Sequence, residues 1–241
     1  MEIHYLSNPQ PGISFALLTD FPDADSETRP EDEDLVSDAF TSVANLSQKY
    51  QQEGSEGDHR FFLFHRKRLW NPVQGKWMGW ERKRGKLHEL GRFLRGADDT
   101  SFLVLSANED VRQQLASVRY VITVDADTLL LPGSAVRLIG TMAHPLNRAR
   151  FDPVNGKVVS GYTILQPRIE INPRSANQTW FSRIFAGDTG LDLYSHAVSD
   201  IYQDLFGEGI YVGKGIYDVD AMMRSVECHI PENTLLSHDL L

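Results

Sequence analysis

Short apolar runs that alternate with helical segments constrain the fold of this 241-residue chain more than any other feature. Buried strands are dense in aromatic and branched residues, and four runs have this character: 14–19, 60–64, 101–105 and 120–124. The segments after Pro30 and Pro132 repeat apolar residues at helical spacing. Strands alternating with helices predict an α/β fold with a mostly parallel sheet and flanking helices. We expect residues 1–241 to form one domain.

Charge and composition exclude several functional classes. The chain carries 24 basic against 33 acidic side chains, a formal net charge of -9, which argues against a nucleic-acid partner. A single cysteine, Cys228, cannot form an internal disulfide. No run reaches the roughly 18–20 apolar residues that a membrane-spanning helix needs. The sequence therefore predicts a soluble chain.

The sharpest local signal is YVITVDADT at 120–128, where an apolar run leads directly into Asp125 and Asp127. A buried strand places such carboxylates at its carboxyl end, where open α/β sheets bind ligands. One or two carboxylates combined with substrate phosphates form a common Mg²⁺ site. The pattern therefore indicates a diphosphate–metal site. Alternatively, the two acids only cap the turn after the strand.

The segment GWERKRGKLHEL at 79–90 gathers Arg82, Lys83, Arg84 and Lys86 around Gly85. Cations are poorly placed at a helix start, because the helix dipole favours acids there. They would be better placed if an anion lay among them. A solvated basic turn is the alternative interpretation.

Two further segments contain candidate site residues. Glycines at 207, 209, 213 and 215 surround Lys214 and allow the backbone to approach a ligand closely, although the pattern matches no known phosphate-binding loop. Near the end of the chain, Asp239 follows Ser237 and His238. A carboxylate at this position could act as a general base if it faced the metal site, or it could form part of a surface pair.

Several motifs occur in a characteristic order: LLTD at 17–20, ERKRGKL at 81–87, VDADT at 124–128, LQPR at 165–168, YVGKGIYDVDA at 211–221 and NTLLSHDL at 233–240. This order resembles that of the GT-A processive glycosyltransferases. Longer phrases such as RLWNPVQGKWMGWERKRGKL and GTMAHPLNRARFDP look specifically like the glycosyltransferase domain of cyclic β-1,2-glucan synthases. The resemblance covers nearly the whole chain.

The resemblance implies a GT-A fold and a role for each matching residue. Asp20 matches the acid that contacts uridine, and Lys83 matches the position that approaches the donor diphosphate. Asp125 and Asp127 match the Asp-x-Asp pair, with Asp127 favoured for direct binding of Mg²⁺ or Mn²⁺. Lys214 falls near the donor or acceptor sugar. Asp239 matches the catalytic base, although Ser237 and His238 depart from the Thr-Glu-Asp motif of related synthases.

The implied activity is inverting transfer of glucose from UDP-glucose to the 2-hydroxyl of a growing β-1,2-glucan. The implied partners are this donor, the glucan acceptor and the remainder of a larger multi-domain membrane synthase. Its expected location is the cytoplasmic face of a bacterial inner membrane. The family's first strand and its Gln-x-x-Arg-Trp type segment have no counterpart here, so we expect a partial domain, incomplete at both ends and poorly active alone.

Two other functions remain possible on sequence grounds. Phosphatases of the haloacid dehalogenase type also place Asp-x-Asp after an apolar strand, but they favour Thr or Val where this chain has Leu129. A non-catalytic scaffold module is the other alternative.

Overall fold

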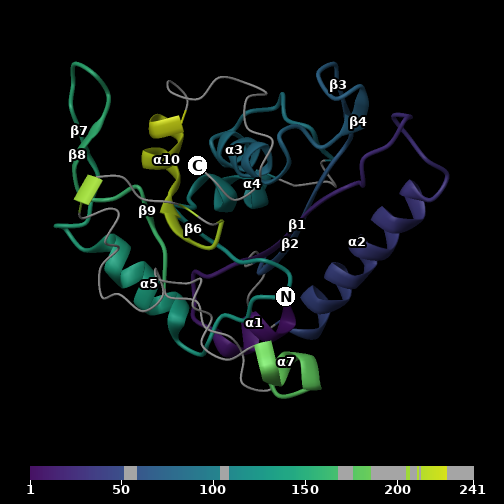
Figure 1. Ribbon diagram of the computed structural model, residues 1–241, viewed down its shortest axis with the longest axis horizontal. Coiled ribbons are helices and arrows are strands. Elements are labelled where there is room, and N and C mark those ends of the chain that lie inside the picture. Colours follow the sequence, from purple (N-terminus) through teal and green to yellow (C-terminus); the bar gives the residue numbers. More distant parts are fainter. Residues whose placement is uncertain are drawn as a thin grey trace.

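The protein is described by a computed structural model that covers residues 1–51, 59–103, 109–167, 176–185, 205–206, 211 and 213–226. It has a mixed α/β fold (Figure 1). The helices are α1 (Glu2–Ser7), α2 (Asp32–Lys49), α3 (Arg82–Leu94), α4 (Glu109–Ala116), α5 (Ser134–Ala143), α7 (Trp180–Phe185) and α10 (Val219–Val226). The strands are β1 (Phe15–Asp20), β2 (Phe61–Arg66), β3 (Leu69–Asn71), β4 (Lys76–Met78), β5 (Phe102–Leu103), β6 (Tyr120–Thr123), β7 (Arg150–Phe151), β8 (Val158–Ser160), β9 (Ile164–Leu165) and β10 (Gly215–Asp218).

Most of the predicted elements are present. The runs at 14–19, 60–64 and 120–124 form β1, β2 and β6, and the run at 101–105 contains β5, with residues 104–105 outside the described part. Both predicted helices are confirmed as α2 and α5. Helix α2 begins two residues after Pro30 and has three acids in its first turn, where they complement the helix dipole.

The expectation of a mostly parallel sheet is wrong for the described residues. Strand β1 pairs with β2 in parallel, but β2 pairs with β5 in the antiparallel sense. A second small sheet has the order β6-β10-β9, and both of its pairings are antiparallel. Runs of apolar residues indicate that a strand is buried, but they do not encode the direction of its neighbour, which depends on how the chain returns to the sheet.

Helices cover both faces of β2, because apolar side chains point to both sides of this strand. On one face, Phe61 and Leu63 pack in a cluster with Tyr5 of α1 and Val43 of α2. On the other face, Phe62 and Phe64 belong to a larger cluster built by α3, α4, β5 and α10. That larger cluster also includes Tyr217 of β10, so the two small sheets share one hydrophobic core.

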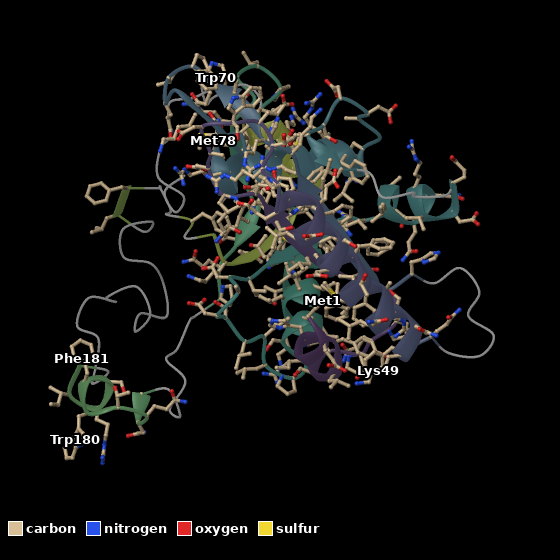
Figure 2. The ribbon with its side chains drawn as sticks, turned by 90° about the vertical axis from the view of Figure 1, so that its right-hand side faces the viewer. Met1, Lys49, Trp70, Met78, Trp180 and Phe181 are labelled. Carbon is tan, nitrogen blue, oxygen red and sulfur yellow. The ribbon has the colours of Figure 1, made fainter. Side chains whose placement is uncertain are left out.

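Smaller elements lie around this core. Figure 2 shows Met1 and Lys49 close together, and the Lys49 ammonium lies 2.7 Å from a Glu2 carboxylate oxygen, which ties α1 to the end of α2. The hairpin β3-β4 carries Trp70 and Met78 at one end of the molecule, and the hairpin β7-β8 projects from the body at another. Exposed Trp180 and Phe181 lie on α7, apart from the core (Figure 2).

Helices long and apolar enough to cross a membrane are not found in the described part of the chain.

Candidate functional site

A buried arginine organises the region where β1 and β2 end. The parallel register places Asp20, the last residue of β1, opposite Arg66, the last residue of β2. The fully buried Arg66 guanidinium donates to Asp20 Oδ1 at 2.6 Å and to Glu89 Oε2 at 2.9 Å. Glu89, on α3, also accepts hydrogen bonds from the backbone and hydroxyl of Ser101. Since a buried charge is tolerated only when it is paired, these carboxylates compensate the guanidinium.

Arg66 also holds the start of α3. Its guanidinium donates to the carbonyl oxygens of Trp80 and Arg82, each at 2.9 Å. Between these contacts the backbone turns through two left-handed residues, Glu81 at φ 42° and Arg82 at φ 48°. Residues other than glycine adopt this conformation at a cost, and such strain persists only where surrounding contacts enforce it. Arg66 therefore fixes the direction in which the first turn of α3 points.

The basic segment that opens α3 is not a solvated turn, because each of its four cations contacts a carboxylate of the protein. These ion pairs are Arg82–Asp23, Lys83–Asp125, Arg84–Glu81 and Lys86–Asp20. The anions that compensate the cations at this helix start are thus acidic side chains, drawn largely from distant parts of the chain.

The first turn of α3 joins two predicted site residues. Lys83 and Lys86 are three positions apart and therefore lie on the same face of the helix. Lys86 reaches Asp20 Oδ2 at 2.6 Å, and Lys83 pairs with Asp125. The carboxyl end of β1 and the loop after β6 consequently meet at one helix terminus, although they are far apart in the sequence.

The antiparallel pairing of β6 and β10 positions Lys214. Thr123, the last residue of β6, lies opposite Gly215, the first residue of β10. Residues just beyond these ends are therefore neighbours, and the Lys214 ammonium lies 2.7 Å from Asp125 Oδ2. Because Lys83 pairs with Asp125 Oδ1, a lysine contacts each oxygen of this carboxylate.

Electrostatics around Asp125 favour the charged carboxylate. Partial burial acts to raise the pKa of Asp125, but hydrogen bonds and charges from Lys214 and Lys83 outweigh it, and the net pKa is lowered. At the end of β6, two residues before Asp125, the Thr123 hydroxyl is hydrogen-bonded to the Tyr211 hydroxyl. Burial, reinforced by the negative charge of Asp125 and opposed by the Thr123 hydrogen bond, raises the pKa of Tyr211 to about 12, so the phenol stays neutral at physiological pH.

Asp127 has a different environment from Asp125. It is exposed, and its Oδ1 accepts a hydrogen bond from the Thr128 hydroxyl at 3.3 Å. Within the described residues it forms no ion pair, and no cluster of three or more metal-ligating side chains occurs there. Asp127, with or without Asp125, would hold a divalent cation only if other oxygens, such as phosphates, completed its coordination shell.

The structure brings together four predicted site residues: Asp20, Lys83, Asp125 and Lys214. Asp127 follows directly in the same loop, while the predicted base Asp239 lies outside the described residues. Sequence analysis did not single out Arg66, Glu89 or Tyr211. Arg66 had a detectable signal, because a charged residue two positions after the apolar run RFFLF requires a partner if that strand is buried.

Comparison with known proteins identifies one relative of this chain. A scan against protein-family models finds no match. A search of curated proteins shows that the chain is homologous, over its whole length, to a segment of a glucan synthase. That relative is named Cyclic beta-(1,2)-glucan synthase NdvB, from Rhizobium meliloti (strain 1021), and the identity is 46% over 242 aligned residues. The chain spans about 8% of the relative's length. The resemblance predicted from the sequence is therefore confirmed.

Replacing Arg66 with Met should strongly destabilise the fold. The substitution leaves Glu89 buried without its cation, and breaking a buried ion pair in this way costs about 3–5 kcal/mol. The control is Arg92→Met, which breaks a more exposed pair with Asp99 and should cost less than about 1 kcal/mol. Urea unfolding of both variants measures the difference. Equal losses would contradict the organising role of Arg66.

Gly213→Ala should displace Lys83 from Asp125. Gly213 has φ 77°, and a Cβ there would lie 2.7 Å from Lys83 Cε and in contact with its ammonium. Gly156→Ala is a matched control, because Gly156 has a similar φ of 70° but open space around a Cβ. We expect Gly213→Ala to lose up to about 1 kcal/mol more in urea unfolding than the control, because the flexible Lys83 side chain moves aside and its partly exposed ion pair with Asp125 is lost. Equal effects would show that backbone strain alone matters at Gly213.

Proposed function

We propose that this chain is part of a GT-A glycosyltransferase domain that transfers glucose from UDP-glucose to the 2-hydroxyl of a β-1,2-glucan, with inversion and with assistance from Mg²⁺ or Mn²⁺. One observation carries the proposal. In a chain 46% identical to a segment of a cyclic β-(1,2)-glucan synthase, Asp125 pairs with Lys83 and Lys214, and Asp20 pairs with Lys86, at the start of α3. This proximity supports the uridine, diphosphate and metal roles that the family resemblance implies for these residues.

The geometry is compatible with donor binding. Both oxygens of Asp20 contact cations, but each carboxylate oxygen has two lone pairs, so Asp20 can still accept a hydrogen bond from a uracil N–H. Lys83 and Lys214 provide two partly exposed ammonium groups beside the Asp-x-Asp loop. Ammonium groups at this place can contact the phosphates of a sugar nucleotide as point charges.

The reaction requires few chemical groups. The glucosyl unit of UDP-glucose is α-linked and the proposed product is β-linked, so a single displacement by the acceptor hydroxyl, with departure of UDP, would give the required inversion. Asp239 would remove the proton of this hydroxyl. Lys83 and Lys214 would stabilise the charge that develops on the departing diphosphate, which is usually the largest contribution to catalysis. A divalent cation at Asp127 would supply further Lewis-acid stabilisation of the same leaving group.

A larger protein is the proposed setting for this domain. The matched relative is about twelve times longer than the matched segment, because the chain covers 8% of it. This supports a multi-domain parent synthase, which we place at the cytoplasmic face of a bacterial inner membrane. The remainder of that synthase and the glucan acceptor would then be the macromolecular partners.

Calorimetric titration of the chain with UDP-glucose tests the donor site. We expect binding that requires Mn²⁺ or Mg²⁺ and is weakened at least about tenfold by Asp127→Ala, because that substitution removes a proposed metal ligand. Asp110→Ala, which removes an exposed acid on α4, is the charge-matched control and should bind normally. Hydrolysis of phosphate monoesters would favour a phosphatase, and the absence of nucleotide binding would favour a scaffold module.

Asp239→Asn separates donor binding from transfer. The variant should bind UDP-glucose normally in this chain. In a chimera where this chain replaces the matching segment of the relative, it should reduce incorporation of labelled glucose into glucan by at least about a hundredfold, since general base catalysis contributes about 10²–10⁴. Asp220→Asn is the control, because Asp220 pairs with Arg95 on an exposed surface. Normal incorporation by Asp239→Asn would show that another group is the base.

A further inference from the structure

Asp125 is held by a pair of counter-ions that come from two separate parts of the chain. Lys83 belongs to the first turn of α3, and Lys214 directly precedes β10. Their side chains are 22% and 25% exposed, and that of Asp125 is 33% exposed. Both ammonium groups are thus partly shielded from water, which makes these ion pairs more persistent than pairs on an open surface.

The two lysines surround the carboxylate oxygens that a metal ion would contact at Asp125. A divalent cation coordinates carboxylate oxygens at about 2.0–2.6 Å, and an ammonium group already contacts each oxygen of Asp125. Each oxygen keeps a second lone pair, but a cation that approached without other ligands would be repelled by both ammonium groups. The described loop is therefore poorly suited to holding a resident metal ion through both of its aspartates.

A diphosphate changes this balance. Asp125, Asp127, Lys83 and Lys214 together carry two negative and two positive charges, which cancel. A metal ion alone would leave the group with an excess of positive charge, and a sugar diphosphate alone would leave an excess of negative charge. When both bind, the phosphates can accept the two ammonium groups and the released Asp125 can face the cation. Lysine suits this exchange, because its ammonium is a point charge on a flexible stem.

We infer that Lys83 and Lys214 form a counter-ion lock on Asp125 that a diphosphate opens, so that the divalent cation binds together with the sugar nucleotide rather than before it. This inference rests on the proposed function and adds an order of binding to it. By linkage, the nucleotide must raise the affinity for the cation by the same factor as the cation raises the affinity for the nucleotide.

Electron paramagnetic resonance of free Mn²⁺ tests the lock without measuring activity. In the wild-type chain we expect UDP-glucose to tighten Mn²⁺ binding at least about tenfold, within the usual range of coupling between sites. In the double variant Lys83→Met and Lys214→Met, Mn²⁺ alone should bind about tenfold more tightly than in the wild type. The effect of UDP-glucose on Mn²⁺ should be correspondingly smaller there.

The double variant Lys49→Met and Lys157→Met removes the same charge from exposed positions outside the lock and should bind Mn²⁺ as the wild type does. If the lysine-lock variant does not fold, the wild-type titrations still decide: equal Mn²⁺ affinity with and without UDP-glucose would overturn the lock. If neither the wild type nor the variants bind Mn²⁺, with or without UDP-glucose, the lock is overturned too.

The two proposals can fail separately. If metal-dependent UDP-glucose binding is found but the Lys83→Met and Lys214→Met chain binds Mn²⁺ alone no better than the wild type, the lock is wrong and the donor site stands. If UDP-glucose never binds but that variant gains Mn²⁺ affinity and inorganic pyrophosphate tightens Mn²⁺ binding in the wild type, the lock stands and the proposed donor is wrong.

Discussion

The buried guanidinium of Arg66 is the interaction on which the arrangement of this chain depends. It joins the ends of two parallel strands to the start and middle of α3 through Asp20, Glu89 and two backbone carbonyls. Without this charge the buried Glu89 would lose its cation, and the left-handed turn at the start of α3 would lack its anchors. One residue therefore sets both the local stability and the direction of the helix that carries Lys83 and Lys86.

The candidate site follows from this anchored helix. Its N-terminal part presents two lysines on one face, and each contacts an acid that follows or ends a different strand. The antiparallel pairing of β6 and β10 then adds Lys214 to the same carboxylate. A network of alternating charges results, in which the acids and lysines neutralise one another. The ion pairs of such a network can exchange partners when charged ligands bind, because each lysine or acid that a ligand releases can pair with another charge.

Sequence similarity and the contacts in the structure support different parts of the proposed function. The similarity to Cyclic beta-(1,2)-glucan synthase NdvB covers all of this chain but about 8% of that protein, so it relates the chain to one segment of a long synthase. The structure adds the contacts of Asp125 with Lys83 and Lys214, and that of Asp20 with Lys86 at the same end of α3. The donor, the metal and the base Asp239 belong to the proposal and to its experiments.

Local patterns in the sequence were sufficient to predict the apolar strands β1, β2 and β6 and the helices α2 and α5, and they singled out residues 83, 125 and 214 as site candidates, which the structure places in contact. These features depend on short-range periodicity, capping and residue type, which a linear pattern records directly. The direction of the strand pairings, the ion pairs of the basic segment and the role of Arg66 were decided by the tertiary structure. They depend on which distant segments become neighbours, and a buried charge acquires its partner only when the chain has closed around it.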